Sequence, residues 1–161
     1  MRLPAGWRRL KEEDLPELLT FCLENEAYFS YIRSTPQTET LRQQLTVLPT
    51  NTVPEQKFFI GLWEKNSLVA IADLIMDWPR AGVVYVGWFM VARALQSKGF
   101  GRHLEAQLSS WLKAGGYHTL RLACVEDNLP GFAFWERCGF LPTGQRCNQG
   151  EYSVLLLEKE L

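Results

Sequence analysis

The sequence lacks the features that mark several common protein classes. Its longest apolar stretch, Ala81–Ala92, falls short of the roughly 20 residues that a transmembrane helix needs. The N-terminus has no apolar signal-peptide core. A formal net charge of −1 indicates no broad basic surface, so we expect neither a membrane nor a nucleic acid as partner.

Cysteine and histidine are also scarce. The four cysteines form no C-x-x-C pair and there are only two histidines, which argues against a metal site. Unpaired cysteines are typical of reduced thiols, so we expect a cytoplasmic protein. With 161 residues, 47% of them hydrophobic, the chain is long enough for one packed domain over residues 1–161.

A glycine-bearing turn is the most informative segment that is present. Gln96–Arg102 follows the apolar run Val83–Val91 and opens a helical pattern over Gly101–Lys113. Its glycines allow a sharp turn and a close approach to a ligand. The free amides of the following helix N-terminus favour an anion, and two basic side chains stand beside them. We therefore predict a phosphate-binding loop.

Two familiar phosphate loops do not fit this turn. A nucleotide P-loop needs a Gly-Lys pair, and the chain has none. A dinucleotide fingerprint needs a third glycine where this chain has Leu104. What remains is Gln-x-x-Gly-x-Gly after a strand, carried by Gln96, Gly99 and Gly101.

A second segment runs from Asn128 to Phe140. Asn128 suits a helix N-cap, and Pro130 falls in the first turn. Gly139 suits the left-handed position after the helix, and Phe140 supplies the usual apolar contact. By itself this is also the pattern of a plain amphipathic helix with a glycine stop.

The two motifs together resemble the GNAT superfamily of N-acetyltransferases. The resemblance implies an α+β fold in which a mixed, mostly antiparallel sheet splays between two central parallel strands, with helices on both faces. The order β-α-α-β-β-β-α-β-α-β-β agrees with the hydrophobic patterning. We expect strands at 7–10, 57–64, 68–78, 83–91, 121–125, 140–145 and 152–157, and helices over 15–23, from Thr35, over 101–113 and from Asn128.

The resemblance implies an enzyme that moves an acetyl group from acetyl-CoA to a primary amine. It assigns the pyrophosphate to the turn and the pantetheine arm to the backbone of the strand before it. Asn128 would contact the pantetheine or cap its helix. The implied cofactor-binding residues are Phe89, Met90, Val91, Gln96, Ser97, Lys98, Gly99, Phe100, Gly101, Arg102, Asn128 and Trp135.

The chain departs from the family pattern at two catalytic positions. Trp135 stands where many relatives have a tyrosine that protonates the leaving thiolate, and indole cannot supply a proton at neutral pH. We expect Trp135 to wall the cofactor tunnel. Ala123 stands where some relatives have a glutamate base. Glu126 is then the nearest carboxylate and our predicted catalytic residue, with Asp73 and Asp77 as rivals.

The remaining candidates do not fix the acceptor. Carboxylates such as these are more often solvated charges at strand ends, and His103 and His118 are expected to face solvent. Family resemblance assigns acceptor choice to a region with Tyr28, Phe29, Tyr31 and Arg33, which suits an apolar or cationic molecule if exposed and is core if buried. The resemblance leaves room for a homodimer. The alternative function is a non-catalytic acyl-CoA binder or sensor, motivated by Trp135 and Ala123.

Overall fold

One seven-stranded sheet organises the protein, whose computed structural model covers residues 1–161. The strands lie in the order β1-β2-β3-β4-β5-β7-β6. Their bounds are β1 Trp7–Arg9, β2 Lys57–Glu64, β3 Ser67–Met76, β4 Val83–Val91, β5 Thr119–Val125, β6 Leu141–Asn148 and β7 Ser153–Glu160. All neighbours pair antiparallel except β4 and β5, which are parallel. The predicted mixed, mostly antiparallel sheet is confirmed.

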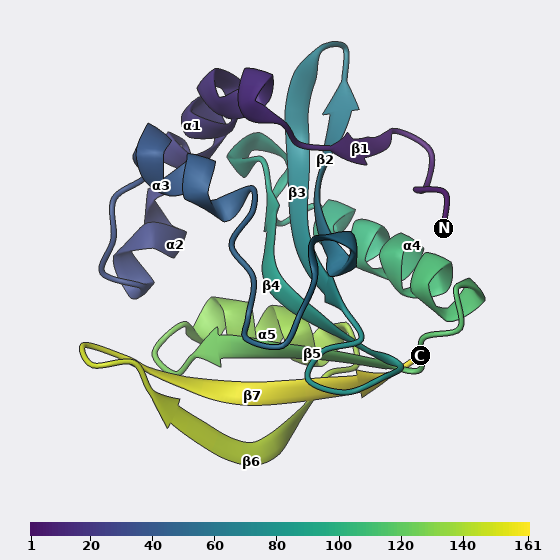
Figure 1. Ribbon diagram of the computed structural model, residues 1–161. Helices are drawn as coiled ribbons and strands as arrows, with labels where there is room; N and C mark the ends of the chain where they lie inside the picture. Colours follow the sequence, from purple (N-terminus) through teal and green to yellow (C-terminus); the bar gives the residue numbers. More distant parts are fainter.

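The sheet opens between its two parallel strands. The pairing of β4 with β5 runs from Val83↔Thr119 to Val86↔Leu122 and then stops, although both strands continue. Figure 1 shows the result, in which β2, β3 and β4 rise steeply while β5, β7 and β6 lie across the base of the molecule. The predicted splay is therefore present, and it begins directly after Val86.

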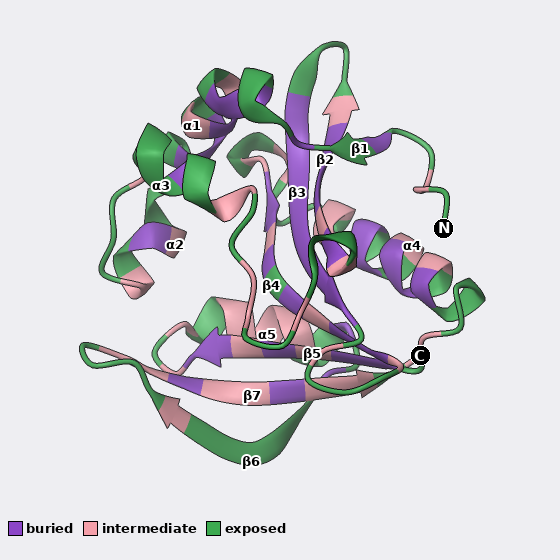
Figure 2. Ribbon diagram, viewed as in Figure 1, coloured by how far each residue is buried: buried purple, intermediate pink, exposed green.

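Helices cover both faces of the sheet, as predicted. On one face α1 (Leu15–Leu23), α2 (Glu26–Tyr31) and α3 (Thr38–Gln44) pack on Ile71, Trp88 and Met90. On the other, α4 (Phe100–Ala114) and α5 (Leu129–Arg137) pack on a larger core. The apolar stripe of α4, which includes Leu104, Leu108 and Leu112, faces that core. Strand β3 is covered on both faces and is buried along nearly its whole length (Figure 2).

Several element bounds differ from those predicted. The short helix α2 was missed, because six residues are too few to establish a helical periodicity. Helix α3 begins at Thr38, after an extended Gln37, and not at Thr35. β3 ends at Met76, and β6 and β7 run past the predicted limits of 145 and 157. Three short 3₁₀ turns complete the chain, at Glu12–Asp14, Pro54–Gln56 and Arg93–Leu95.

None of the helices has both the length and the apolar character required to cross a lipid bilayer.

Candidate functional site

The turn before α4 presents a row of free backbone amides. No amide from Ser97 to Arg102 donates a hydrogen bond within the protein, and the first bonded amide is that of His103, which donates to the carbonyl of Gly99 at 3.0 Å. The side chains from Gln96 to Gly99 are exposed, so a ligand can reach the turn. Unpaired amides together with the positive end of a 15-residue helix form an anion site.

Left-handed backbone shapes this turn. Ser97 has φ 60° and Gly99 has φ 79°, and successive amides around such residues converge on a shallow concavity suited to an anion. A Cβ at Gly99 would meet no atom within 4 Å. The space in front of Gly99 is therefore open.

Gly101, whose amide is one of the free amides, also has a packing role. A Cβ there would lie 3.2 Å from the Phe134 ring and 3.4 Å from Val91 Cγ2. The absent side chain allows α4 to pack closely on β4 and α5. Of the two glycines in the motif, Gly99 shapes the turn and Gly101 seats the helix.

Gln96 fastens the turn to two other elements. Its Nε2 donates to Val91 O at the end of β4 and to Asn25 Oδ1 between α1 and α2, both at 2.7 Å. Asn25 is buried and donates in turn to Phe21 O at 2.8 Å. Because the backbone amide of Gln96 also has a partner, Arg93 O, this residue positions the loop and has no free donor. The side chain of Lys98 folds back onto Ala94 O at 2.9 Å.

A bulge at Gly87 sets which way β4 faces. Asp73 on β3 pairs with Trp88 and Leu74 pairs with Val86, so Gly87 is the extra residue. The alternation of side chains between the two faces of the sheet shifts by one residue there. Val86 packs on the α4 side, whereas Trp88 and Met90 pack with α1–α3.

The same pairing leaves two amides on the open edge of β4. Ala92 N donates to Val69 O at 2.8 Å, and bonded and non-bonded pairs alternate along an antiparallel ladder. Met90 therefore bonds to β3, while the N–H groups of Phe89 and Val91 point away from β3 into the splay. Of the three residues predicted for the pantetheine arm, Phe89 and Val91 offer a backbone donor and Met90 does not.

Helix α5 forms an aromatic wall below this edge. Trp135 lies with its ring centroid 5.6 Å from that of Phe89, 4.9 Å from Phe134 and 5.0 Å from Phe140. The aromatic residues of α5 are all only half-buried, which leaves apolar surface beside the splay. The arrangement agrees with the expected wall. Asn128 caps this helix, because its Oδ1 accepts from Gly131 N at 2.9 Å.

Asp73 is not the solvated strand-end charge that was expected. It lies in the middle of β3, 2% exposed, and its Oδ2 accepts from Lys57 Nζ at 2.9 Å and Gln44 Nε2 at 2.6 Å. Its Oδ1 has no partner, and neither has Nε1 of the neighbouring Trp88. Burial raises the pKa of the Asp73 carboxyl, and Lys57 and Gln44 offset part of that rise.

Glu126, the predicted catalytic residue, has a different environment. It follows the last residue of β5, and both of its carboxylate oxygens accept from Arg146 on β6, the closest contact being 2.8 Å. Its side chain is 41% exposed. The hydrogen bonds from Arg146 lower the pKa of Glu126 below its ordinary value. Asp77 lies in the β3–β4 turn, where it accepts from Gly82 N.

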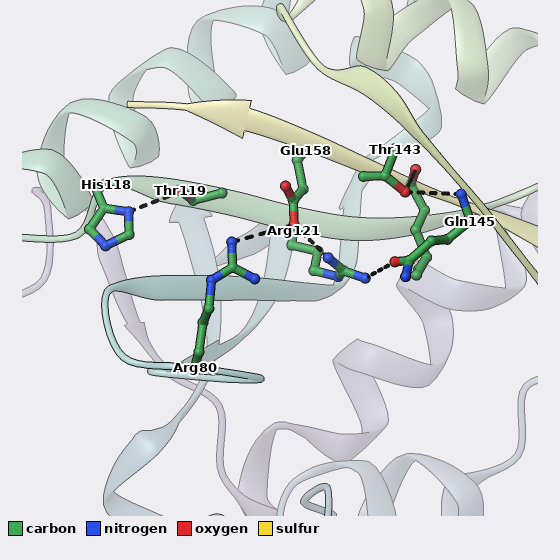
Figure 3. Close-up of polar contacts among 8 residues, drawn as sticks. Arg80, His118, Thr119, Arg121, Thr143, Gln145 and Glu158 are labelled. Carbon is green, nitrogen blue, oxygen red and sulfur yellow. Dashed lines mark hydrogen bonds and ion pairs between the residues drawn. The ribbon is translucent and has the colours of Figure 1, made fainter.

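Strand β5 carries an ion-paired arginine. Figure 3 shows Arg121 donating to Glu158 on β7 and to Gln145 on β6, with Arg80 reaching the same glutamate from the β3–β4 turn. His118 contacts Thr119 at the far end of the strand. His103 is exposed on α4.

The aromatic residues of α2 differ in how far they are buried. Phe29 is buried, whereas Tyr28 is half-buried and stacks on Trp88 at 5.9 Å between centroids. The Tyr28 hydroxyl makes no hydrogen bond. Burial raises the pKa of its phenol, and the nearby Tyr152 and Cys124 add to the rise. Tyr31 is half-buried and Arg33 is exposed. Sequence reasoning missed Asn25, Gln44, Lys57 and Gly87. Only Gly87, an isolated glycine in an apolar strand, gave a signal.

Comparison with known proteins identifies this architecture. The model of the acetyltransferase (GNAT) family matches residues 14–140, so the chain belongs to that family. As a member of this family, the protein uses acetyl-CoA as its acetyl donor. A search of curated proteins found no match.

Solved structures share the fold over almost the whole chain. PaiA N-acetyltransferase from Thermoplasma acidophilum, in complex with coenzyme A, is 21% identical with a TM-score of 0.68, covering 96% of this chain and 98% of its own. An acetyltransferase from Thermus thermophilus is 20% identical with a TM-score of 0.76, covering 96% of each chain. Ribosomal-protein-alanine N-acetyltransferase from Brucella melitensis is 20% identical with a TM-score of 0.69, covering 96% and 99%.

Proposed function

We propose that the protein transfers the acetyl group of acetyl-CoA directly to a primary amine. The observation that carries this proposal is the row of free amides from Ser97 to Arg102 beside an open strand edge. A pyrophosphate needs such a row, and an extended amide-bearing arm needs such an edge. The strand edge and the row of free amides lie at opposite ends of one short segment, residues 89–102.

The residues divide the work in a simple way. The amides of Ser97 to Arg102 hold the pyrophosphate, and Gln96 keeps their loop in place. The amides of Phe89 and Val91 hydrogen-bond the pantetheine arm and the thioester oxygen, where a well-placed donor is typically worth about 3 kcal/mol to the transition state. Trp135 fills the wall beside the sulfur, and Asn128 sets the start of α5. Bound acetyl-CoA supplies the activated acetyl group.

The acceptor side supports an amine on a small or flexible carrier. The half-exposed rings of Tyr28, Tyr85 and Tyr152 gather around the open part of the sheet, and aromatic faces attract cations. The Brucella melitensis neighbour is a ribosomal-protein-alanine N-acetyltransferase, which points to the amine of a ribosomal-protein alanine. A peptide with an N-terminal alanine therefore belongs among the acceptors to test, and its α-amine, with a pKa of about 8, is easier to deprotonate than a lysine.

An acceptor screen tests the proposal. The full-length protein is incubated with acetyl-CoA and, one at a time, butylamine, benzylamine, a lysine-containing peptide and an alanine-terminated peptide, and release of CoA thiol is followed. We expect at least one amine to raise thiol release above hydrolysis, with an acetylated product seen by mass spectrometry.

The same screen decides the second candidate function, an acyl-CoA sensor without catalysis. That function is favoured by Trp135 and Ala123, which replace an acid and a base found in relatives. A sensor binds acetyl-CoA tightly in calorimetry and releases no thiol with any amine. An enzyme binds acetyl-CoA and also releases thiol with at least one amine.

A further inference from the structure

The structure holds one buried carboxylate that the fold does not fully explain. Asp73 Oδ2 is satisfied by Lys57 and Gln44, but Oδ1 is buried and has no partner. An ionised oxygen in that state is costly, so native proteins seldom leave one unpaired unless it has a task. A purely structural ion pair would be expected to use both oxygens.

The carboxylate lies at the start of the splay. A Cβ at Gly87 would be 3.4 Å from Asp73 Oδ2 and 3.7 Å from its Cγ. Gly87 is the bulged residue, it is exposed, and it directly follows the last residue of β4 that pairs with β5. Gly87 therefore lies against the Asp73 carboxylate and is itself exposed, at the point where the two central strands part.

The groups around Asp73 keep it available as a base. Lys57 from β2 is the one charged group that faces it, while Gln44 from α3 and Trp88 from β4 are neutral. Burial raises the pKa of Asp73 above its ordinary value, which makes its carboxylate a stronger base. Glu126 is held by Arg146 and its pKa is lowered, which makes it a weaker base.

We propose that Asp73 is the catalytic residue that takes the proton from the acceptor's ammonium group, beside the exposed Gly87 at the start of the splay. This inference rests on the proposed function and names the group that the acetyl transfer requires. The substrate class it fits is an amine that arrives protonated.

The reaction has two stages, proton removal and acyl transfer. The ammonium loses one proton to the Asp73 carboxylate, directly or through a water molecule, which frees the nitrogen lone pair. The nitrogen then bonds to the acetyl carbon while the carbon–sulfur bond breaks and its electron pair stays on sulfur. The second nitrogen proton ends on that sulfur, giving the CoA thiol, and Asp73 returns its proton to solvent.

Asp73→Asn tests this role. Asp14→Asn is the matched control, because Asp14 is also a buried carboxylate paired with a cation, Arg8, and lies beside the edge strand β1. Using the amine that is most active in the screen, we expect Asp73→Asn to lower kcat/KM by about 10²-fold or more. Acetyl-CoA affinity should be unchanged, because Asp73 lies away from the turn at Gln96–Arg102. Asp14→Asn should keep the parent's rate, and Glu126→Gln tests the rival base.

A pH profile separates a base from a structural residue. Lys57→Met removes the cation that holds the Asp73 pKa down, so the acidic limb of log kcat/KM should move to higher pH. A structural role would reduce the rate without moving that limb. If Asp73→Asn does not fold, Asp73→Asn with Lys57→Met removes both charges together and leaves no unpaired ion.

Each outcome has a distinct meaning. A folded Asp73→Asn or double variant with the parent's turnover, or an unmoved limb in Lys57→Met, overturns the role of Asp73 and leaves the proposed function intact. Loss of turnover in Glu126→Gln alone assigns the proton to Glu126 instead. A parent that releases no CoA thiol with any amine overturns the proposed function, and the role of Asp73 with it.

Discussion

Gln96 Nε2 lies 2.7 Å from Asn25 Oδ1, and this contact joins the cofactor turn to the link between α1 and α2. Asn25 is buried and has its own bond to Phe21 O, so the joint is fixed from both sides. The turn before α4 and the helices α1 and α2 are therefore one connected unit.

We predict that Gln96→Met weakens acetyl-CoA binding although Gln96 has no free donor for the ligand. The substitution keeps the side-chain length and leaves Val91 O and Asn25 Oδ1 without their donor, at a cost of about 1–3 kcal/mol. Part of that cost should appear as a looser turn and a dissociation constant raised by about tenfold. Calorimetry measures it, with Gln145→Met as a control remote from the turn. Unchanged affinity would mean that the turn holds its shape alone.

Gly99 tests the anion site with a matched pair. Gly99→Asp and Gly99→Asn both place a side chain in open space and both carry the strain of a left-handed residue, roughly 1 kcal/mol. Only the aspartate adds negative charge in front of the free amides. We expect Gly99→Asp to bind acetyl-CoA at least tenfold more weakly than Gly99→Asn, and the difference to shrink at high salt. Equal affinities would argue against a pyrophosphate at this turn.

Trp135 is expected to act as a wall. Trp135→Phe should keep most of the activity, since phenylalanine preserves contacts with Phe89 and Phe140. Trp135→Ala should weaken acetyl-CoA binding and lower the free energy of unfolding by less than the ~3–5 kcal/mol of a fully buried aromatic, because the ring is half-buried. Denaturant titration and steady-state kinetics measure both. A folded Trp135→Phe that binds normally but turns over orders of magnitude more slowly would identify the indole N–H as a donor to the leaving thiolate.

The four thiols should differ sharply in reactivity. Burial raises the pKa of Cys22 to about 12 and that of Cys124 and Cys138 to about 11, whereas Cys147 on β6 is half-exposed. Because the thiolate is the reactive form, a thiol reagent at neutral pH should label Cys147 first and the others only on unfolding. Mass spectrometry of the native protein counts the labelled cysteines, and Cys147→Ser should abolish the fast phase of labelling. Fast labelling of a second site would show that the core opens.

Asp14 should contribute to stability at neutral pH and lose that contribution in acid. Hydrogen bonds from Arg8, at 2.7 and 2.8 Å, outweigh burial and lower the pKa of Asp14. Its contribution is therefore full above the ordinary value of about 3.9 and disappears as the pH falls through the lowered value. Since Arg8 is 46% exposed, we expect only about 1 kcal/mol. Asp14→Asn should lower the urea midpoint at pH 7, and the gap to the parent should narrow below pH 4.

The fold was largely predictable because its signals are local. Short segments of the sequence predict the central elements. The apolar run Val83–Val91 predicts a strand, the glycine turn predicts the start of a helix, and Asn128 predicts a helix N-cap. Their order along the chain matched one family. Helix α2 was not predictable in this way. It is six residues long, and its helical state comes from packing Phe29 and Tyr28 against Trp88, a residue far along the chain.

The site was predictable only in part, for the same reason. Free amides follow from a turn and a helix start, so residues 97–102 could be found from the sequence. The burial of Asp73 depends on Lys57, which reaches it from the neighbouring strand, and on Gln44 from α3. The spacing of residues along the chain does not predict those contacts. The packing role of Gly101 could not be predicted, because the sequence does not show Phe134 packed against it.

The bulge at Gly87 makes β4 sensitive to length as well as to composition. Deleting Gly87 itself would join Val86 to Trp88, which already pair with neighbouring residues of β3, so both would keep their present faces. Deleting a residue after the bulge, such as Phe89, would instead turn the end of the strand over, so that Met90 would face α4 and Val91 would face α1–α3. Any chimera that exchanges β4 with that of a relative must therefore keep the number of residues between the bulge and the end of the strand.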